Sequence, residues 1–106
     1  MAVMVLGQSA PSATTNTTLY TVPSGKESVV STLSVCNRGI AEVTYRVAVR
    51  PAGATLANSH YLVYDMTIEG NDSHFLTIGI TLEATDVVTV YASSADLSFS
   101  AFGDET

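Results

Sequence analysis

ESVVSTLSVC (residues 27–36) and EVTYRVAVR (residues 42–50), joined through NRG at 37–39, decide how this chain folds. In the second run four largely apolar residues alternate with four others: Val43, Tyr45, Val47 and Val49 have one parity, and Thr44, Arg46, Ala48 and Arg50 have the other. This period of two is typical of a strand with one buried and one solvated face. In the first run, Val29, Leu33 and Val35 share a parity that only Ser31 breaks. Asn and Gly tolerate the positive φ of tight turns, so we predict a β-hairpin whose inner face forms half of a core.

Other short runs of alternating residues follow the same pattern, separated by Pro, Gly, Asn, Asp and Ser. They predict strands at Val3–Gln8, Leu19–Val22, His60–Asp65 (continued by Met66–Glu69), Phe75–Ile80, Val87–Ala92 and Leu97–Ala101. Ser9–Thr18 is rich in Ser, Thr and Ala and is predicted to be an extended loop. No run has the period of an amphipathic helix. We therefore predict an all-β single domain over residues 1–106, an antiparallel β-sandwich of about eight short strands, jelly-roll or Ig-like.

The composition is unusual for an isolated domain. Charged residues make up only 13% of the 106, against about 25% in typical proteins. This shortage favours a surface that is covered by other copies or by a larger assembly, and a surface rich in Ser and Thr is the alternative. The net charge is −6, with only four cations, Lys26, Arg38, Arg46 and Arg50. Binding to nucleic acid or to an anionic membrane needs clustered cations, so neither is expected.

The single cysteine and the apolar start of the chain indicate in which cellular compartment the protein is expected. Cys36 is the only cysteine, so no intrachain disulfide is expected, and we predict that it is a small buried hydrophobe. The apolar start at residues 1–6 lacks a basic region, and we interpret it as the first strand rather than as a secretion signal. We expect a protein that is made in the cytoplasm and needs no export.

The sequence contains few candidates for catalytic or metal-binding residues. His60 and His74 lie near Asp65 and Asp72 in the sequence, but their spacing matches no metal motif. The serines lack the strand–turn–helix setting of a nucleophile elbow, and paired acids lack an aromatic groove. The sequence therefore predicts no enzyme, and neither catalytic residues, a metal site nor a cofactor.

Four residues are candidate assembly contacts. Arg46 and Arg50 project from the outward face of the central strand, either as solvated charges or to pair with an acidic neighbour in an assembly. Tyr61 and Tyr64 are predicted on opposite faces of one strand, so one of them faces away from the core. Tyrosine is enriched at interfaces for its large area and polar tip, and simple surface exposure is the alternative.

Longer motifs resemble a family of small β-sandwich virion structural proteins of tailed phages. The resemblance covers nearly the whole chain and rests on these segments: LGQS (6–9), TTLYTVPSGK (17–26), VVSTLSVCNRG (29–39), YRVAVRPAGA (45–54), HYLVYD (60–65), ATDVVTVYA (84–92) and LSFSAFG (97–103). It implies a virion component without catalysis, made in the host cytoplasm.

The resemblance leaves the position in the particle open. Our first hypothesis is a capsid decoration (cement) protein, a homotrimer that contacts the major capsid protein and stabilises the head shell. The alternatives are a tail-fibre or baseplate attachment module and, third, a carbohydrate-binding module for the host surface. The partner, the symmetry and the contacting face are left open, as is whether Ser9–Thr18 is ordered without its partner.

Overall fold

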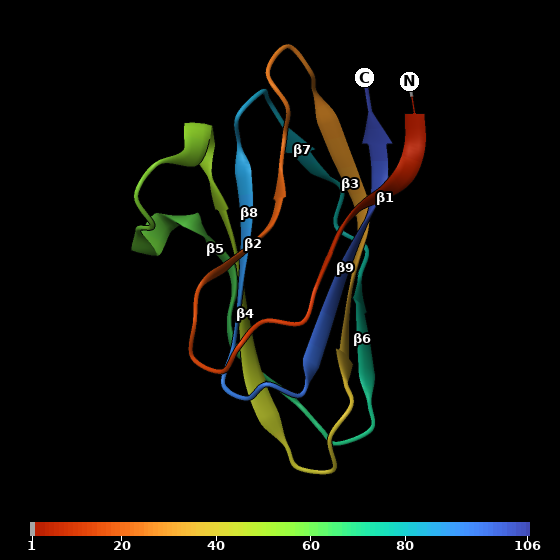
Figure 1. Cartoon of the computed structure of the whole chain (residues 1–106), viewed down its shortest axis with the longest axis vertical. Coiled ribbons are helices and arrows are strands. Elements are labelled where there is room, and N and C mark those ends of the chain that lie inside the picture. The colour runs from red at the N-terminus through yellow and green to blue at the C-terminus, as the bar shows by residue number, and fades with distance from the viewer. Residues whose placement is uncertain (1) are drawn as a thin grey trace.

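Two antiparallel β-sheets pack face to face in the computed structural model, which describes residues 2–106 (Figure 1). Sheet A contains, in spatial order, β1 (Ala2–Ser9), β9 (Leu97–Glu105), β3 (Ser28–Asn37) and β6 (Ser73–Leu76), with β7 (Ile80–Leu82) also paired to β3. Sheet B contains β2 (Thr17–Thr21), β8 (Val87–Ala92), β4 (Val43–Arg50) and β5 (Tyr61–Ile68). Two single 3₁₀ turns, Pro51–Gly53 and Asn58–His60, lie between β4 and β5. The predicted antiparallel β-sandwich is confirmed.

The strand pairing has jelly-roll topology, one of the two topologies that the sequence predicts. Each strand of the first half of the chain pairs with one of the second half: β1 with β9, β2 with β8, β3 with β6 and β7, and β4 with β5. The predicted single strand Phe75–Ile80 is broken at Thr77–Gly79, where Gly79 has φ 57°. β6 and β7 therefore pair with different parts of the same edge of β3.

The predicted hairpin between residues 27–36 and 42–50 is wrong, although both strands exist. β3 lies in sheet A and β4 lies in sheet B, so the link between them is an arch from one sheet to the other. Asn37 is buried at its base, and its side-chain Nδ2 donates to the carbonyl oxygens of Ala41, Ile68 and Glu69 at 2.9, 3.3 and 3.1 Å. Asn37, Arg38 and Gly39 have the sequence of a tight turn, but the contacts of Asn37 to the end of β5 hold them in an arch.

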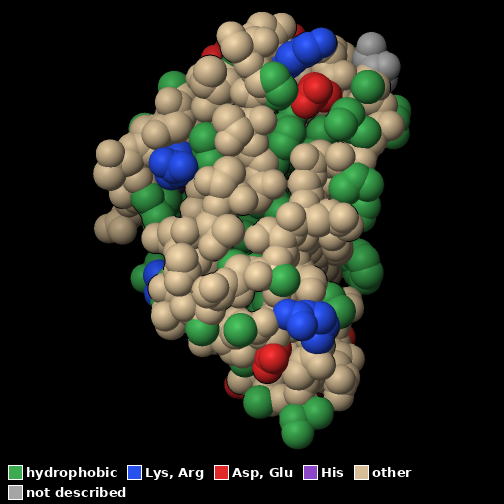
Figure 2. Space-filling view, in the orientation of Figure 1, with side chains coloured by type: hydrophobic (Ala, Val, Ile, Leu, Met, Phe, Trp, Pro, Cys, Tyr) green, Lys and Arg blue, Asp and Glu red, His purple; other side chains and the backbone are tan. Residues whose placement is uncertain are grey.

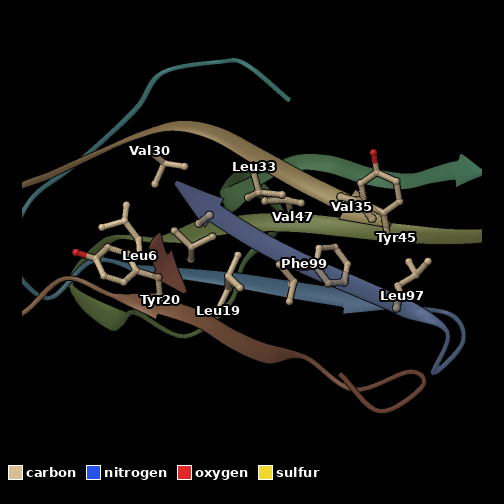
Figure 3. Close-up of a cluster of buried hydrophobic side chains, with 14 of the residues drawn as sticks. Leu6, Leu19, Tyr20, Val30, Leu33, Val35, Tyr45, Val47, Leu97 and Phe99 are labelled. Carbon is tan, nitrogen blue, oxygen red and sulfur yellow. The ribbon is translucent and has the colours of Figure 1, made fainter. Parts of the chain in front are cut away.

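The core lies between the sheets and consists of aliphatic and aromatic side chains from both (Figure 3). The predicted parity of β4 is confirmed, because Tyr45 and Val47 are fully buried while Arg46 and Arg50 point outward. The Tyr45 hydroxyl lies 2.8 Å from Nδ1 of His74, and this hydrogen bond links β4 to β6 across the sandwich. Burial raises the pKa of Tyr45. A buried tyrosine needs such a polar partner.

A second inward tyrosine lies at the end of the sandwich near the chain termini. The Tyr20 hydroxyl donates to the Glu105 carboxylate at 2.6 Å and lies 2.6 Å from the Ser28 hydroxyl. Burial raises the pKa of Tyr20, and the hydrogen bond to Glu105 raises it further. These contacts join β2 of sheet B to β3 and β9 of sheet A, so Tyr20, like Tyr45, links the two sheets through its hydroxyl.

The parity predicted for β3 is correct in only one half of the strand. A β-bulge at Ser31 shifts the register against β9, since Val30 pairs with Gly103 and Thr32 with Phe102. Val30 therefore points inward, and Val29 is exposed, contrary to the prediction. A bulge adds one residue and reverses which parity faces the core, and no local feature of the sequence marks it.

Cys36 also differs from its prediction, because it alternates with the inward-facing Val35. It lies beyond the bulge on the outward parity of β3, opposite Ser98 of β9 and Ser73 of β6, and is partly exposed. The expected small buried hydrophobe is therefore a thiol on the outer face of sheet A.

Candidate functional site

Arg46 lies at the centre of a row of aromatic side chains on the outer face of sheet B. Its guanidinium carbon is 4.3 Å from the ring centre of Tyr64 on β5 and 4.2 Å from that of Tyr91 on β8. Tyr64 in turn meets Tyr61 edge to face, with ring centres 4.9 Å apart and planes at 85°. We call Tyr61, Tyr64, Arg46 and Tyr91 the tyrosine–arginine row. It spans three adjacent strands, and each member restricts the rotamers of the next.

The row depends on irregular pairing between β4 and β5. Val47 pairs with Val63 and Ala48 with Tyr61, so Leu62 has no partner on β4. This extra residue places Tyr61 on the same side of the sheet as Tyr64. The prediction that the two tyrosines lie on opposite faces is therefore wrong, because strict alternation fails at a bulge.

Asp65 fixes the position of Arg46. It has φ 51° at a second irregularity, between the pairs Tyr45–Met66 and Val47–Val63. Its carboxylate accepts from Nε of Arg46 at 2.7 Å and from the Nη2 group at 3.4 Å. The hydrogen bond to Asp65 raises the pKa of Arg46. Because the pair is partly exposed, we assign it about 0.5 kcal/mol, and each cation–π contact contributes about 0.5–1 kcal/mol.

Arg50 has a different role. Its Nε donates to the Thr89 hydroxyl at 3.0 Å, and Nη1 donates to the carbonyl oxygens of Gly53 and Ala54 at 3.2 and 3.0 Å. It therefore holds the turn after β4 against β8. Of the four predicted contact residues, the structure brings Arg46, Tyr61 and Tyr64 together, whereas Arg50 lies about 13 Å further along β4, at 3.3 Å per residue.

Sequence reasoning missed two members of this site, Tyr91 and Asp65. The alternation of Tyr91 with Val88, Val90 and Ala92 predicts its outward direction, but the sequence does not reveal that β8 is the neighbour of β4. The sequence left open whether Arg46 is a solvated charge or pairs with an acidic neighbour in an assembly, and in the structure it forms an ion pair with Asp65 of the same chain. No local signal predicts positive φ at this aspartate.

The row is the kind of surface that carries binding energy in protein interfaces. Tyr and Arg are enriched among the residues that dominate such interfaces. Tyr64 is 58% exposed, and its neighbours on β5, Leu62 and Met66, are 48% and 46% exposed. The contacts to Arg46 and Tyr61 already order the Tyr64 ring, so a partner that packs on it loses less side-chain entropy on binding.

The histidines and aspartates that lie near one another in the sequence are apart in the structure. His60 accepts from the backbone N–H of Ala57, and His74 is bonded to Tyr45 in the other half of the sandwich. Asp72 accepts from the backbone N–H of Ser73. Within residues 2–106, no group of three or more His, Cys, Asp or Glu side chains converges on a point where a metal ion could bind.

A cleft of about 470 Å³ lies at the end of the sandwich that carries the termini. Three carboxylates, those of Glu27, Glu83 and Asp104, are in its lining, together with Thr81 and Leu82. This negative lining disfavours anionic ligands, and the cleft is open to solvent.

The outer face of sheet A differs from that of sheet B in its chemistry. Its outward side chains are small, polar and uncharged, or apolar, with one exception. By strand register they are Val3, Val5, Gln8, Val29, Thr32, Ser34, Cys36, Ser73, Phe75, Thr81, Ser98, Ser100, Phe102 and Asp104. Figure 2 shows hydrophobic side chains along the right-hand margin, on the side where Figure 1 places β1, β3 and β6.

Comparison with protein-family models, curated proteins and solved structures finds no match for this chain. Across residues 2–106, no helix is long and apolar enough to span a membrane.

Proposed function

We propose that this chain is a non-enzymatic structural protein of a tailed-phage virion, and specifically a capsid decoration protein that stabilises the head shell. The single observation that carries a contact role is the tyrosine–arginine row, in which Arg46 is held between Tyr64 and Tyr91. The assignment to a phage particle rests on the sequence resemblance, which covers nearly the whole chain.

The fold supports this proposal without deciding it. Jelly-roll sandwiches occur in viral capsid and lectin domains. Because one fold serves many functions, the argument has to come from the surface. Here the outer face of sheet B offers ordered aromatic groups, in a chain with only 13% charged residues. Such a surface is suited to a permanent contact with another protein.

In this proposal the chain acts through binding alone. A protein that binds the assembled shell but not its separate subunits lowers the free energy of the shell and delays its disruption. The tyrosine–arginine row lies on the major capsid protein, with Tyr64 as the central contact. Arg46 keeps its ion pair with Asp65, so no charge is left unpaired in the buried contact.

Copy number tests this role directly. Particles of the phage that encodes the chain are purified, and the amount of this protein is compared with the major capsid protein by gel densitometry. Decoration predicts hundreds of copies per particle. A handful of copies would contradict it and would favour the tail-fibre or baseplate module instead.

The contact surface is tested with variants on particles stripped of this protein. Tyr64→Ala should weaken rebinding at least about tenfold, as expected for a central interface tyrosine. Ser24→Ala, in an exposed turn, is the matched control and should rebind like the wild type. Equal rebinding of both variants would exclude the row as the contact. Retention of the free protein on a host polysaccharide column would favour the carbohydrate-binding alternative.

A further inference from the structure

The first strand, β1, is attached to the sandwich by few side-chain contacts. Its 8 residues pair with β9 alone in the described chain. Leu6 is the only residue of β1 in the core cluster, whereas Ala2–Val5 are all exposed. Because neighbouring residues of a strand point to opposite faces, this half of β1 is open to solvent on both faces. β1 therefore depends mainly on its backbone hydrogen bonds to β9.

The loop between β1 and β2, residues 10–16, contains a strained residue. Thr14 has φ 53°, a left-handed conformation that β-branched residues rarely adopt. Its backbone N–H donates to the carbonyl oxygen of Ala92, at the end of β8, at 2.7 Å. An extended loop would release the strain at Thr14. Strain in the loop that joins a segment to its domain favours exchange of that segment between copies.

We propose that β1 is exchanged between copies of this chain, so that β1 of one copy pairs with β9 of another. The contacts fix the second copy as the partner, because the exchanged strand keeps the register that β1 and β9 have within one chain. The closed and exchanged states then differ mainly in the conformation of the loop and in the entropy of association.

The loop is long enough for this exchange. It runs from β1 in sheet A to β2 in sheet B (Figure 1). Stacked sheets lie about 10 Å apart, whereas seven extended residues span up to about 24 Å. The loop therefore has the length to carry β1 away from its own β9.

Charge does not oppose the exchange. The first 25 residues contain no charged side chain, although the chain has a net charge of −6. At the acidic end of β9, Asp104 and Glu105 pair with Val3 and Ala2, which are uncharged in either copy. The donated strand therefore adds no like charge to the copy that accepts it.

Cross-linking between two variants tests the exchange. One variant carries Val3→Cys and the other Asp104→Cys, at paired positions of β1 and β9, and both carry Cys36→Ser. They are mixed at about 500 μM, so that mass action favours association, and are then treated with a short bis-maleimide. Exchange should give at least about fivefold more cross-linked pairs than a control mixture, because thiols held side by side have a high effective concentration. In the control, Thr67→Cys on exposed β5 replaces Asp104→Cys.

Two loop variants of the same cysteine pair test the role of the strain. Thr14→Gly relieves the closed chain, since glycine adopts positive φ freely, and should lower the yield of cross-linked pairs at least about threefold. Thr15→Gly is the matched control and should not lower the yield. The hydroxyls of both threonines donate to the carbonyl oxygen of Ala13, but only Thr14 has a positive φ.

Two results would overturn the inference. One is a yield from the paired cysteines no higher than that of the Thr67→Cys mixture, and the other is an equal yield for the two loop variants. The inference stands apart from the phage proposal, since exchange of β1 in solution can be measured whether or not the chain belongs to a virion.

Discussion

The outer faces of sheet A and sheet B have the same strand geometry but differ in the chemistry of their side chains. On sheet B, charged and aromatic groups are satisfied within the chain, as Arg46 binds Asp65 and Arg50 binds Thr89. On sheet A, two side-chain hydrogen bonds join neighbouring strands, from Gln8 to the Ser100 hydroxyl and from Ser31 to the Phe102 carbonyl oxygen, and Asp104 is the one charged residue among the described outward side chains. The side chains on the outer face of sheet B are ordered by contacts within the chain, whereas those on the outer face of sheet A make few such contacts.

This difference indicates on which outer face substitutions should change the folding free energy of the chain. Substitutions on sheet B should change the folding free energy, because they remove contacts already made in the monomer. Substitutions on the outer face of sheet A should change it less, since most of these side chains make few contacts within the chain. Four changes should affect the folding free energy to different degrees, from the core side of β4 to the hydroxyl groups of the buried tyrosines.

The largest effect should come from the inner face of β4. Val47→Asp buries an unpaired carboxylate in the core and should cost at least about 4 kcal/mol, a large part of the stability of a small domain. The outward neighbour Arg46→Ser is the matched control. Circular dichroism and gel filtration should show an unfolded or aggregated Val47→Asp protein and a folded control. If both fold equally well, the assignment of inner and outer faces is wrong.

The next effect should come from the arch between the two sheets. Asn37→Ala leaves three backbone carbonyls without their side-chain donor and should cost about 1–3 kcal/mol. Asn16→Ala, in an exposed loop, should stay within about 0.5 kcal/mol of the wild type. Urea unfolding of both variants measures the difference. Equal midpoints would mean that the arch does not need Asn37.

A smaller effect is expected for the tyrosine–arginine row. Arg46→Ser removes two cation–π contacts and a partly exposed ion pair, together about 1.5–2.5 kcal/mol. For a domain of this size, 1 kcal/mol corresponds to a fall in Tm of about 4–8 °C. A double-mutant cycle with Asp65→Ala should give a coupling energy of about 0.2–1 kcal/mol. A Tm equal to that of the wild type would show that the row is not ordered in the free chain.

The smallest effect should be confined to alkaline pH. The pKa values of Tyr20 and Tyr45 are raised in the folded chain, mainly by burial. Above the ordinary tyrosine pKa of about 10, the unfolded chain therefore binds fewer protons than the folded one, so stability falls as pH rises. Urea unfolding between pH 8 and 11.5 should show this fall, and Tyr45→Phe should make it less steep. Equal slopes for the variant and the wild type would contradict a buried Tyr45 hydroxyl.

The inner face of β4 and the outward direction of Arg46 followed from alternation alone. In such a strand every second side chain faces the core, and no distant contact is needed to assign them. The same reasoning placed eight strand regions and excluded a helical fold. It failed at Val29 and at the pair Tyr61 and Tyr64, because the bulges at Ser31 and Leu62 reverse the alternation.

The sequence by itself therefore determined the all-β class, the approximate strands and most of the core. Those depend on the polarity of residues close together in the chain. Only the tertiary structure decided that β3 and β4 belong to different sheets, and that Tyr91, Arg46 and Tyr64 form one row. The physical reason is that strand neighbours and bulges are fixed by hydrogen bonds between distant segments, such as those of Asn37 to the end of β5, which leave no periodic trace in the sequence.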